Sequence, residues 1–371
     1  MSALARQLGI NPSTVSRWED GSAAPDNEAL QRLAAELQVR PEYFLRDPFK
    51  AKQPVFFRSL ASTLTRDLNY QRAQMRWLQE ISSTLEHYVD LPVLDLPDVL
   101  SGATWRQLRD EDIEAIALQL RSHWRIGDGP CSDVVSVLDR VGFVVGSIEM
   151  GTAKLDGLCS WSPIDGRPHI LLATDKMSFP RRQMDAAHEM AHAVLHRDVT
   201  EEEFETELKA IEAQAFRLAS AFLMPSTTYP MEVKSPSLAQ LLLLKERWRV
   251  SIKAQIRRLA DLDMISPEYA IQMYKLYSAK GWNKEEPLDK QWAPSQPRVL
   301  RDAMQLIVDE GVRTKADLLA VEFTIAAEDV AELCGLPKGW FDRDPAEVVR
   351  LKPTSRPPML QAGDVVPFRR P

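Results

Sequence analysis

Cysteine is scarce in this sequence. The chain has 371 residues and only three cysteines, Cys131, Cys159 and Cys334, which lie far apart. Isolated thiols form neither a disulfide framework nor a zinc-thiolate cluster. Small domains held together by disulfides or by zinc-thiolate sites are therefore excluded. This usage is typical of a protein in a reducing compartment.

Long hydrophobic runs and a signal peptide are also missing. The longest apolar run, "LAQLLLL" at residues 238–244, is far shorter than the roughly 20 residues that cross a bilayer. The first residues contain no basic segment followed by an apolar one. We therefore expect a cytoplasmic protein without a membrane partner.

An overall excess of positive charge is lacking as well. The formal net charge is −7, which argues against a protein that coats nucleic acid. Residues 234–258 are a local exception, because they contain seven basic residues and a single acid, Glu246. The basic residues are Lys234, Lys245, Arg247, Arg249, Lys253, Arg257 and Arg258. Two interpretations stay open: phosphate contacts, or a solvated helix face.

The remaining composition is that of an ordinary folded protein with two to three domains. Apolar residues make up 44% of the chain and charged residues 27%. The patterns predict an α+β, mostly helical fold. The predicted regions are a compact helical unit at 1–48, a helical linker at 49–98, a mixed core at 99–232, a basic helical subdomain at 233–289, and a helical C-terminal region at 290–371 with a loose tail.

The mixed core contains short β-rich segments at residues 141–150, 155–163 and 167–174, separated by turn residues. They predict a small antiparallel sheet. The last segment, "RPHILLAT", directly precedes the histidine motif described next. We expect it to present an edge to which a peptide adds as a further strand.

Histidine is rare but concentrated. The chain has six histidines, and three of them, His188, His192 and His196, lie within nine residues. His188, Glu189 and His192 form H-E-x-x-H, whose histidines share one helix face and can bind one zinc ion. Glu189 is then placed to take a proton from the attacking water. The alternative is a chance pattern on a solvated helix.

A catalytic zinc site usually has a third protein ligand. His196 lies about 12 Å in helical rise from His188, too far for one ion, so we predict a supporting or packing role. Thr200 and Glu203 form a capping box for a helix over 201–224. Glu212 lies on the flank of the apolar stripe of that helix, where a carboxylate needs a cation.

Glu212 is therefore predicted to be the third ligand, with Glu207 as the substitute. The alternative is a half-exposed glutamate paired with Lys209 or an arginine.

Residues 1–48 suggest DNA binding. Gly9, Ile10 and Asn11 form a tight turn between helices over 2–8 and 12–19, and a further helix covers 27–37. In helix-turn-helix proteins the second helix enters the major groove. The predicted DNA contacts are Ser13, Thr14, Ser16 and Arg17. The alternative is that Ser13 and Thr14 only cap the helix.

Two resemblances follow from these motifs. "HEMAHAVLH", followed by "IEAQAFRLASAFLMP", resembles the ImmA/IrrE family of zinc metallopeptidases. "LKERWRVSIKAQIRRL" and "GWNKEEP" look like the helical region that follows this peptidase core, so the resemblance covers roughly residues 55–290. It implies a zincin-like core with His188, His192 and Glu212 as zinc ligands and Glu189 as the base. Gln214 and the "FRLA" that starts at Phe216 depart from the usual Asn and Phe-Ala of the family.

Residues 1–48 resemble the XRE, or lambda-repressor-like, helix-turn-helix. That family normally has one more helix before "LARQLG", so we expect the first helix of the domain to be missing.

The resemblances imply a DNA-binding transcription regulator with a zinc-dependent endopeptidase domain, cleaving a repressor or other regulatory protein in a stress or mobile-element response. The expected cofactor is Zn²⁺, and the expected partners are double-stranded DNA, a protein substrate and a second copy of the chain. The alternative is a regulator whose peptidase fold is a non-catalytic sensor of a metal or ligand. An intact Glu189 favours catalysis, because a structural metal site needs no base.

Overall fold

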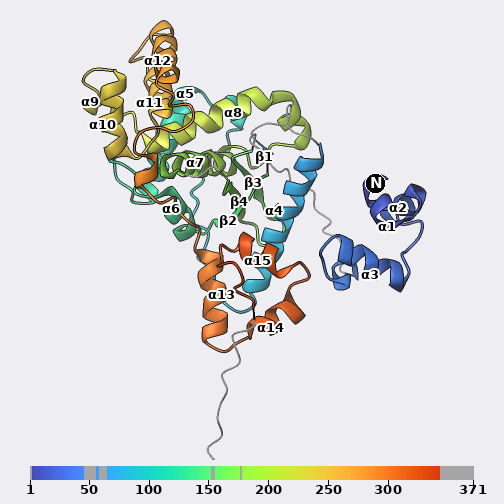
Figure 1. Ribbon diagram of the computed structural model, residues 1–371. Helices are drawn as coiled ribbons and strands as arrows, with labels where there is room; N and C mark the ends of the chain where they lie inside the picture. Colours follow the sequence, from blue (N-terminus) through green and yellow to red (C-terminus); the bar gives the residue numbers. More distant parts are fainter. Residues whose placement is uncertain (1, 46–55, 58–64, 152–154, 176–177, 343–371) are drawn as a thin grey trace, which may run out of the picture. The chain divides into compact units, whose positions relative to one another are not determined.

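The computed structural model of the chain describes residues 2–45, 56–57, 65–151, 155–175 and 178–342 (Figure 1). It confirms the predicted fold class, α+β and mostly helical, with a helix-turn-helix at the N-terminus, a mixed middle region and helices toward the C-terminus. The tail that the sequence predicts to be loose lies outside the described residues, which end at residue 342.

The N-terminal unit contains helices α1 (Ser2–Leu8), α2 (Pro12–Glu19) and α3 (Asn27–Glu36), followed by the short helix η1 (Pro41–Leu45). Gly9 turns the chain between α1 and α2 with φ of +67°, which is easy only for glycine. The side chain of Asn11 caps α2 by accepting a hydrogen bond of 3.0 Å from the amide of Ser13. The predicted turn and cap are therefore present.

A four-stranded sheet forms the centre of the middle region, in the order β1-β3-β4-β2. Its strands are β1 (Phe56–Phe57), β2 (Val144–Ile148), β3 (Gly157–Trp161) and β4 (Pro168–Ala173). β3 pairs antiparallel with both β1 and β4, but β2 pairs parallel with β4. The sheet is thus mixed, which corrects the expected antiparallel arrangement. The chain reverses direction between β2 and β3 and again between β3 and β4, so β4 runs in the same direction as β2.

The order of the strands also corrects the expectation that the segment "RPHILLAT" presents a free edge. β4 lies between β3 and β2 and uses both of its edges for pairing. The sequence contains no signal for this position, because every residue of β2, β3 and β4 is buried and the strands therefore lack an alternating pattern.

Helices cover both faces of the sheet, and successive residues of a strand enter two different cores. In β4, Ile170 and Leu172 pack in the core that contains α7 (Phe179–Leu195), whereas Leu171 and Ala173 pack in the other. Residues of α4 (Thr65–Leu85), α13 (Val299–Asp309) and α15 (Ala327–Leu333) build this second core (Figure 1). Segments that precede and follow β2, β3 and β4 in the sequence therefore complete the layer behind the sheet.

The other helices surround the first core or connect the layers. They are η2 (Trp105–Gln107), α5 (Asp110–His123), α6 (Val134–Arg140), α8 (Glu201–Leu223), α9 (Tyr229–Glu232), α10 (Leu238–Trp248), α11 (Ile252–Asp261), α12 (Pro267–Ala279), η3 (Asp289–Gln291), α14 (Lys315–Asp317) and η4 (Leu318–Glu322). None of the helices among the described residues has the length and apolar character needed to span a bilayer.

Two of the seven basic residues at 234–258 lie inside the protein, which neither interpretation foresaw. Lys234, Arg247, Lys253 and Arg257 are exposed, as a solvated helix face predicts. Lys245 on α10 and Arg258 on α11 are fully buried. Lys245 Nζ lies 2.7 Å from Glu286 Oε2, and Arg258 Nη2 donates to Glu114 Oε2 at 2.7 Å. The balancing carboxylates come from distant parts of the sequence, so a local count of charge does not include them.

Candidate metal centre

Helix α7 carries the histidine motif through the interior of the fold. Pro180 lies in its first turn, where the missing N–H of proline costs no helical hydrogen bond. Every residue from Ala186 to Leu195 is buried. Four alanines in this stretch keep the helix narrow, so that it packs closely on β3, β4 and α8.

The side chains of His188, His192 and Glu212 meet in one cluster that can hold a metal ion. The Nε2 atoms of His188 and His192 are 3.1 Å apart on α7. Glu212 approaches from α8, with Oε2 at 3.3 Å from His188 Nε2 and Oε1 at 3.2 Å from His192 Nε2. Both histidines are buried, whereas the Glu212 side chain is 14% exposed.

These three separations fit a tetrahedral zinc site. Zinc bonds of about 2.0–2.1 Å to nitrogen and oxygen place neighbouring ligand atoms of a tetrahedron about 3.3–3.4 Å apart. The two histidine nitrogens are 3.1 Å apart, and each lies 3.2 or 3.3 Å from a different oxygen of Glu212, so each contact taken by itself is close to that value. Two imidazole nitrogens and a carboxylate suit zinc, and three protein ligands leave a fourth position for water or substrate.

The charge of Glu212 also fits this site. Burial raises the pKa of its carboxyl, but the interactions with His188 and His192 outweigh burial and hold the pKa below its ordinary value. The carboxylate contacts these histidines rather than Lys209. Glu207 is exposed at a kink in α8 and does not belong to the cluster.

His196 contacts His192 from the side away from the cluster. Its Nδ1 lies 3.1 Å from His192 Nδ1, and its Nε2 lies 3.1 Å from Gln214 Oε1. The Gln214 amide in turn donates to the Trp105 carbonyl at 2.8 Å. His196 thus begins a largely buried hydrogen-bond chain from His192 to the Trp105 carbonyl. The sequence did not reveal this chain, because Gln214 and Trp105 lie far from His196 along it.

The chain of hydrogen bonds determines the tautomer of His192. A carbonyl only accepts, so the Gln214 NH₂ faces Trp105 and its oxygen faces His196. His196 Nε2 then carries the proton, and His196 Nδ1 accepts the proton on His192 Nδ1. Burial, with His192 close by, lowers the pKa of His196 to about 3, so this ring is neutral. The His192 Nε2 lone pair is left facing the cluster.

Glu189 lies on α7 against strand β3. It is 2% exposed. A Cβ atom added to Gly157 would stand 2.9 Å from both Cγ and Oε1 of Glu189, closer than packing allows. Glycine at this strand position therefore makes room for the carboxylate, a requirement that the sequence pattern alone does not indicate.

A cleft of about 1250 Å³ opens beside the metal cluster. Glu212 and Phe216 line it from α8, and Arg181 and Asp185 line it from α7. The centroid of the Phe216 ring lies 4.3 Å from that of the His188 ring, with the two rings tilted, and Glu212 itself lines the cleft, so the cleft reaches the cluster. Its far wall comes from residues 274–294, which sequence reasoning did not connect with the site.

The predicted DNA-contact residues lie on α2. Ser13 and Arg17 are exposed, and Thr14 and Ser16 are half-buried, while Val15 faces the small core. The Ser13 hydroxyl donates to Asn11 Oδ1 at 2.9 Å and so also takes part in the cap. DNA contact by these four residues stays a prediction.

Two family models match the chain. Residues 138–260 match the model described as the IrrE N-terminal-like domain, of a peptidase family, and residues 1–44 match a model described as helix-turn-helix. The first match includes α7 and α8, which carry the metal cluster. No curated protein matches the chain. The matches support a regulator that joins a DNA-binding domain to a peptidase-like domain.

Proposed function

Because one chain carries a helix-turn-helix and an IrrE N-terminal-like domain, we propose that it is a transcription regulator with a zinc-dependent endopeptidase. Its substrate is a repressor or another regulatory protein of a stress or mobile-element response. The observation that carries the proposal is the cluster of His188, His192 and Glu212, with Glu189 beside it on the same helix.

In this proposal His188, His192 and Glu212 hold the zinc ion. A zinc ion bound there supplies Lewis-acid chemistry that activates water and polarises a peptide carbonyl. The close approach of the two histidine nitrogens to each other and to the Glu212 carboxylate, and the lowered pKa of that carboxyl, support this assignment.

Glu189 is the proton carrier of the reaction. Its carboxylate accepts a proton from the attacking water and delivers it to the leaving amine. The packing of its side chain against Gly157 restricts where the carboxylate can lie. His196 and Gln214 keep the His192 ring in the tautomer and orientation that a metal ligand needs.

Helix α2 is the proposed DNA-reading helix. Arg17 is exposed on it, and its planar guanidinium suits bidentate contacts with guanine or phosphate. Helix-turn-helix regulators commonly bind two half-sites, so we propose a homodimer on double-stranded DNA.

The test combines metal content with cleavage. Elemental analysis is expected to find about one zinc ion per wild-type chain, lost in His192→Ala and Glu212→Ala, with circular dichroism confirming that each variant is folded. The zinc-loaded protein is then incubated with a peptide library from a digested cell lysate, and mass spectrometry identifies new N-termini.

New N-termini from the wild type, absent with Glu189→Gln at equal zinc content, support catalysis. Zinc binding without cleavage by either protein contradicts it and favours the metal or ligand sensor. Absence of zinc from every sample, even with added metal, refutes the zinc assignment.

A further inference from the structure

In the cleft beside the metal cluster, and among the residues that the structure describes, the acidic side chains are paired, whereas several basic side chains are not. Glu212 contacts the two histidines, and Asp185 lies 3.8 Å from Arg181. Glu285 pairs with Lys290 at 2.6 Å. These three carboxylates therefore already have partners.

Three lysines of the cleft have no such partner. Within the part of the chain that the structure describes, Lys209, Lys253 and Lys284 line the cleft with exposed side chains that take part in no ion pair. They come from α8, from α11 and from the segment after α12. Arg257, another cation of the lining, already pairs with Asp261 at 2.8 Å. The net uncompensated charge of the cleft is positive.

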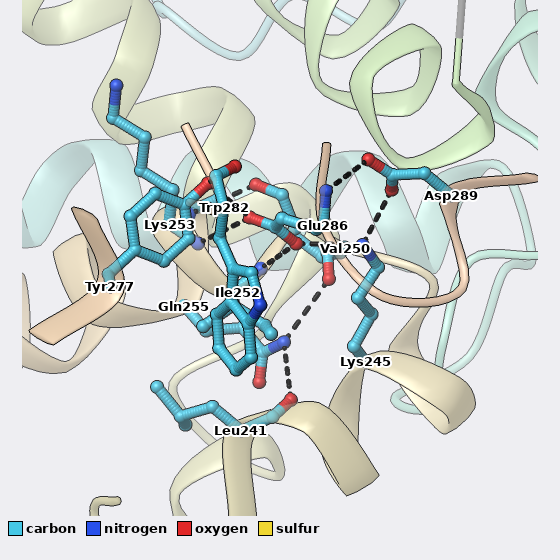
Figure 2. A network of polar contacts seen from close by, with 12 residues as sticks. Leu241, Lys245, Val250, Ile252, Lys253, Gln255, Tyr277, Trp282, Glu286 and Asp289 are labelled. Atoms are coloured by element: carbon cyan, nitrogen blue, oxygen red, sulfur yellow. Dashed lines mark hydrogen bonds and ion pairs between the residues drawn. The ribbon is translucent and has the colours of Figure 1, made fainter. Parts of the chain in front are cut away.

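A buried polar network holds the wall that carries Lys284. Figure 2 shows the Glu286 carboxylate between Lys245 and the first turn of α11. Glu286 Oε2 lies 2.7 Å from Lys245 Nζ and accepts from the Ile252 amide at 2.8 Å. The Tyr277 hydroxyl donates to Glu286 Oε1 at 2.9 Å. These bonds attach residues 282–294 to α10, α11 and α12, so the wall is preorganised for a ligand.

Aromatic rings provide apolar surface between the charges. Phe216, Tyr274, Trp282 and Trp292 all line the cleft. With a volume of about 1250 Å³, the cleft is larger than the roughly 300–1000 Å³ of a small-molecule pocket. Its size and its mixture of rings and cations suit several residues of an extended chain.

From this geometry we propose that the cleft binds an extended peptide segment whose acidic side chains face Lys209, Lys253 and Lys284, and whose apolar side chains contact the aromatic rings. The proposal deepens the proposed function, on which it rests, by assigning the substrate class: acidic segments beside the bond that is cleaved.

A peptide fits the cleft better than a nucleic acid strand does. A strand carries one phosphate at every nucleotide, whereas the three unpaired lysines come from separate elements, with aromatic rings and already paired carboxylates such as Asp185 and Glu285 in the same lining. A peptide carries negative charge only at selected side chains, so it can place carboxylates at the lysines and neutral residues at the acids.

The experiment measures binding without cleavage. Zinc-loaded Glu189→Gln protein is titrated against three fluorescent peptides that share one apolar sequence and carry glutamate, glutamine or lysine at the same positions. A single-stranded oligothymidylate is the nucleic acid probe. Each cleft lysine is changed to glutamate in turn, and Lys338→Glu, an exposed lysine outside the lining, is the control for total charge.

The glutamate peptide is expected to bind most tightly and the lysine peptide least. Each of Lys209→Glu, Lys253→Glu and Lys284→Glu is expected to weaken its binding about fivefold, and added salt to reduce the preference. Lys338→Glu is expected to have no effect. Equal binding of the glutamate and glutamine peptides, or binding of none, overturns the proposal. The proposal is also overturned if the oligothymidylate binds more tightly than the glutamate peptide and the same lysine substitutions weaken its binding.

The two proposals fail separately. If the wild type cleaves peptides but the charge preference is absent, only the substrate class is wrong. If the preference is present and the wild type cleaves nothing, the endopeptidase assignment is wrong and the cleft remains a peptide-binding site.

Discussion

The hydrogen-bond chain from His192 to Trp105 predicts that His196 controls metal affinity without touching the metal. In the wild type the acceptor for the proton on His192 Nδ1 is His196 Nδ1, 3.1 Å away and fully buried. His196→Leu removes this acceptor. The His192 ring is then free to turn or to change its tautomer, and only one arrangement presents Nε2 to the cluster.

The magnitude follows from the cost of that lost acceptor. A buried donor without its partner costs about 1–3 kcal/mol, which corresponds to a roughly 5- to 150-fold change in an equilibrium constant. Loss of a hydrogen-bonding partner behind a metal-bound histidine typically lowers metal affinity about 10- to 100-fold. We therefore expect His196→Leu to weaken zinc binding by about that factor while the ligand set stays intact.

The assay is competition for zinc between the folded protein and a chromophoric chelator at neutral pH. His196→Asn is the matched variant, because its side-chain oxygen can stand near the position of the lost Nδ1 and accept the same proton. We expect it to retain most of the affinity. Wild-type affinity in His196→Leu, or equal losses in the leucine and asparagine variants, would refute the reasoning.

Three further predictions concern a glycine beside the site and two buried charged groups of the fold. Gly157→Ala adds a Cβ 2.9 Å from Glu189 Oε1, so peptide turnover should fall by about tenfold or more at unchanged zinc content, as kinetics and elemental analysis would show. Burial raises the pKa of Asp139 to about 7, so its ionisation lowers wild-type stability as pH rises from about 4 to 7. Asp139→Asn should remove this loss, and thermal melts of both proteins across that range should diverge as pH rises. Lys245→Met leaves both the Glu286 carboxylate, 5% exposed, and the Asp289 carboxylate without their cation, so denaturant unfolding should show a loss of about 3–5 kcal/mol.

The arrangement of the core links these effects to distant parts of the chain. The helix-turn-helix and the metal cluster belong to separate family matches, yet α4, α13 and α15 lie outside both matches and cover one face of the sheet. The strands on which Glu189 rests therefore depend on segments from before and after the peptidase-like domain. Truncation to the matched residues alone would expose that apolar face.

Local sequence determined the elements that carry the candidate site. The spacing of His188 and His192 fixes a shared helix face, because residues four apart lie one turn from each other. Thr200 and Glu203 cap α8 as predicted, and Gly9 turns the chain between α1 and α2. Each of these features depends on residues a few positions apart, so a single short stretch contains all the information.

Tertiary structure decided what those elements meet. The position of β4 inside a mixed sheet, the burial of Lys245 against Glu286, and the contact of His196 with Gln214 were not determined by any local pattern. Uniformly buried strands do not indicate their neighbours, and a charged side chain does not indicate whether its partner lies near or far along the chain. The physical reason is that strand order and ion pairing minimise the free energy of the whole packed core, whereas helix faces, caps and turns are set by short-range backbone geometry.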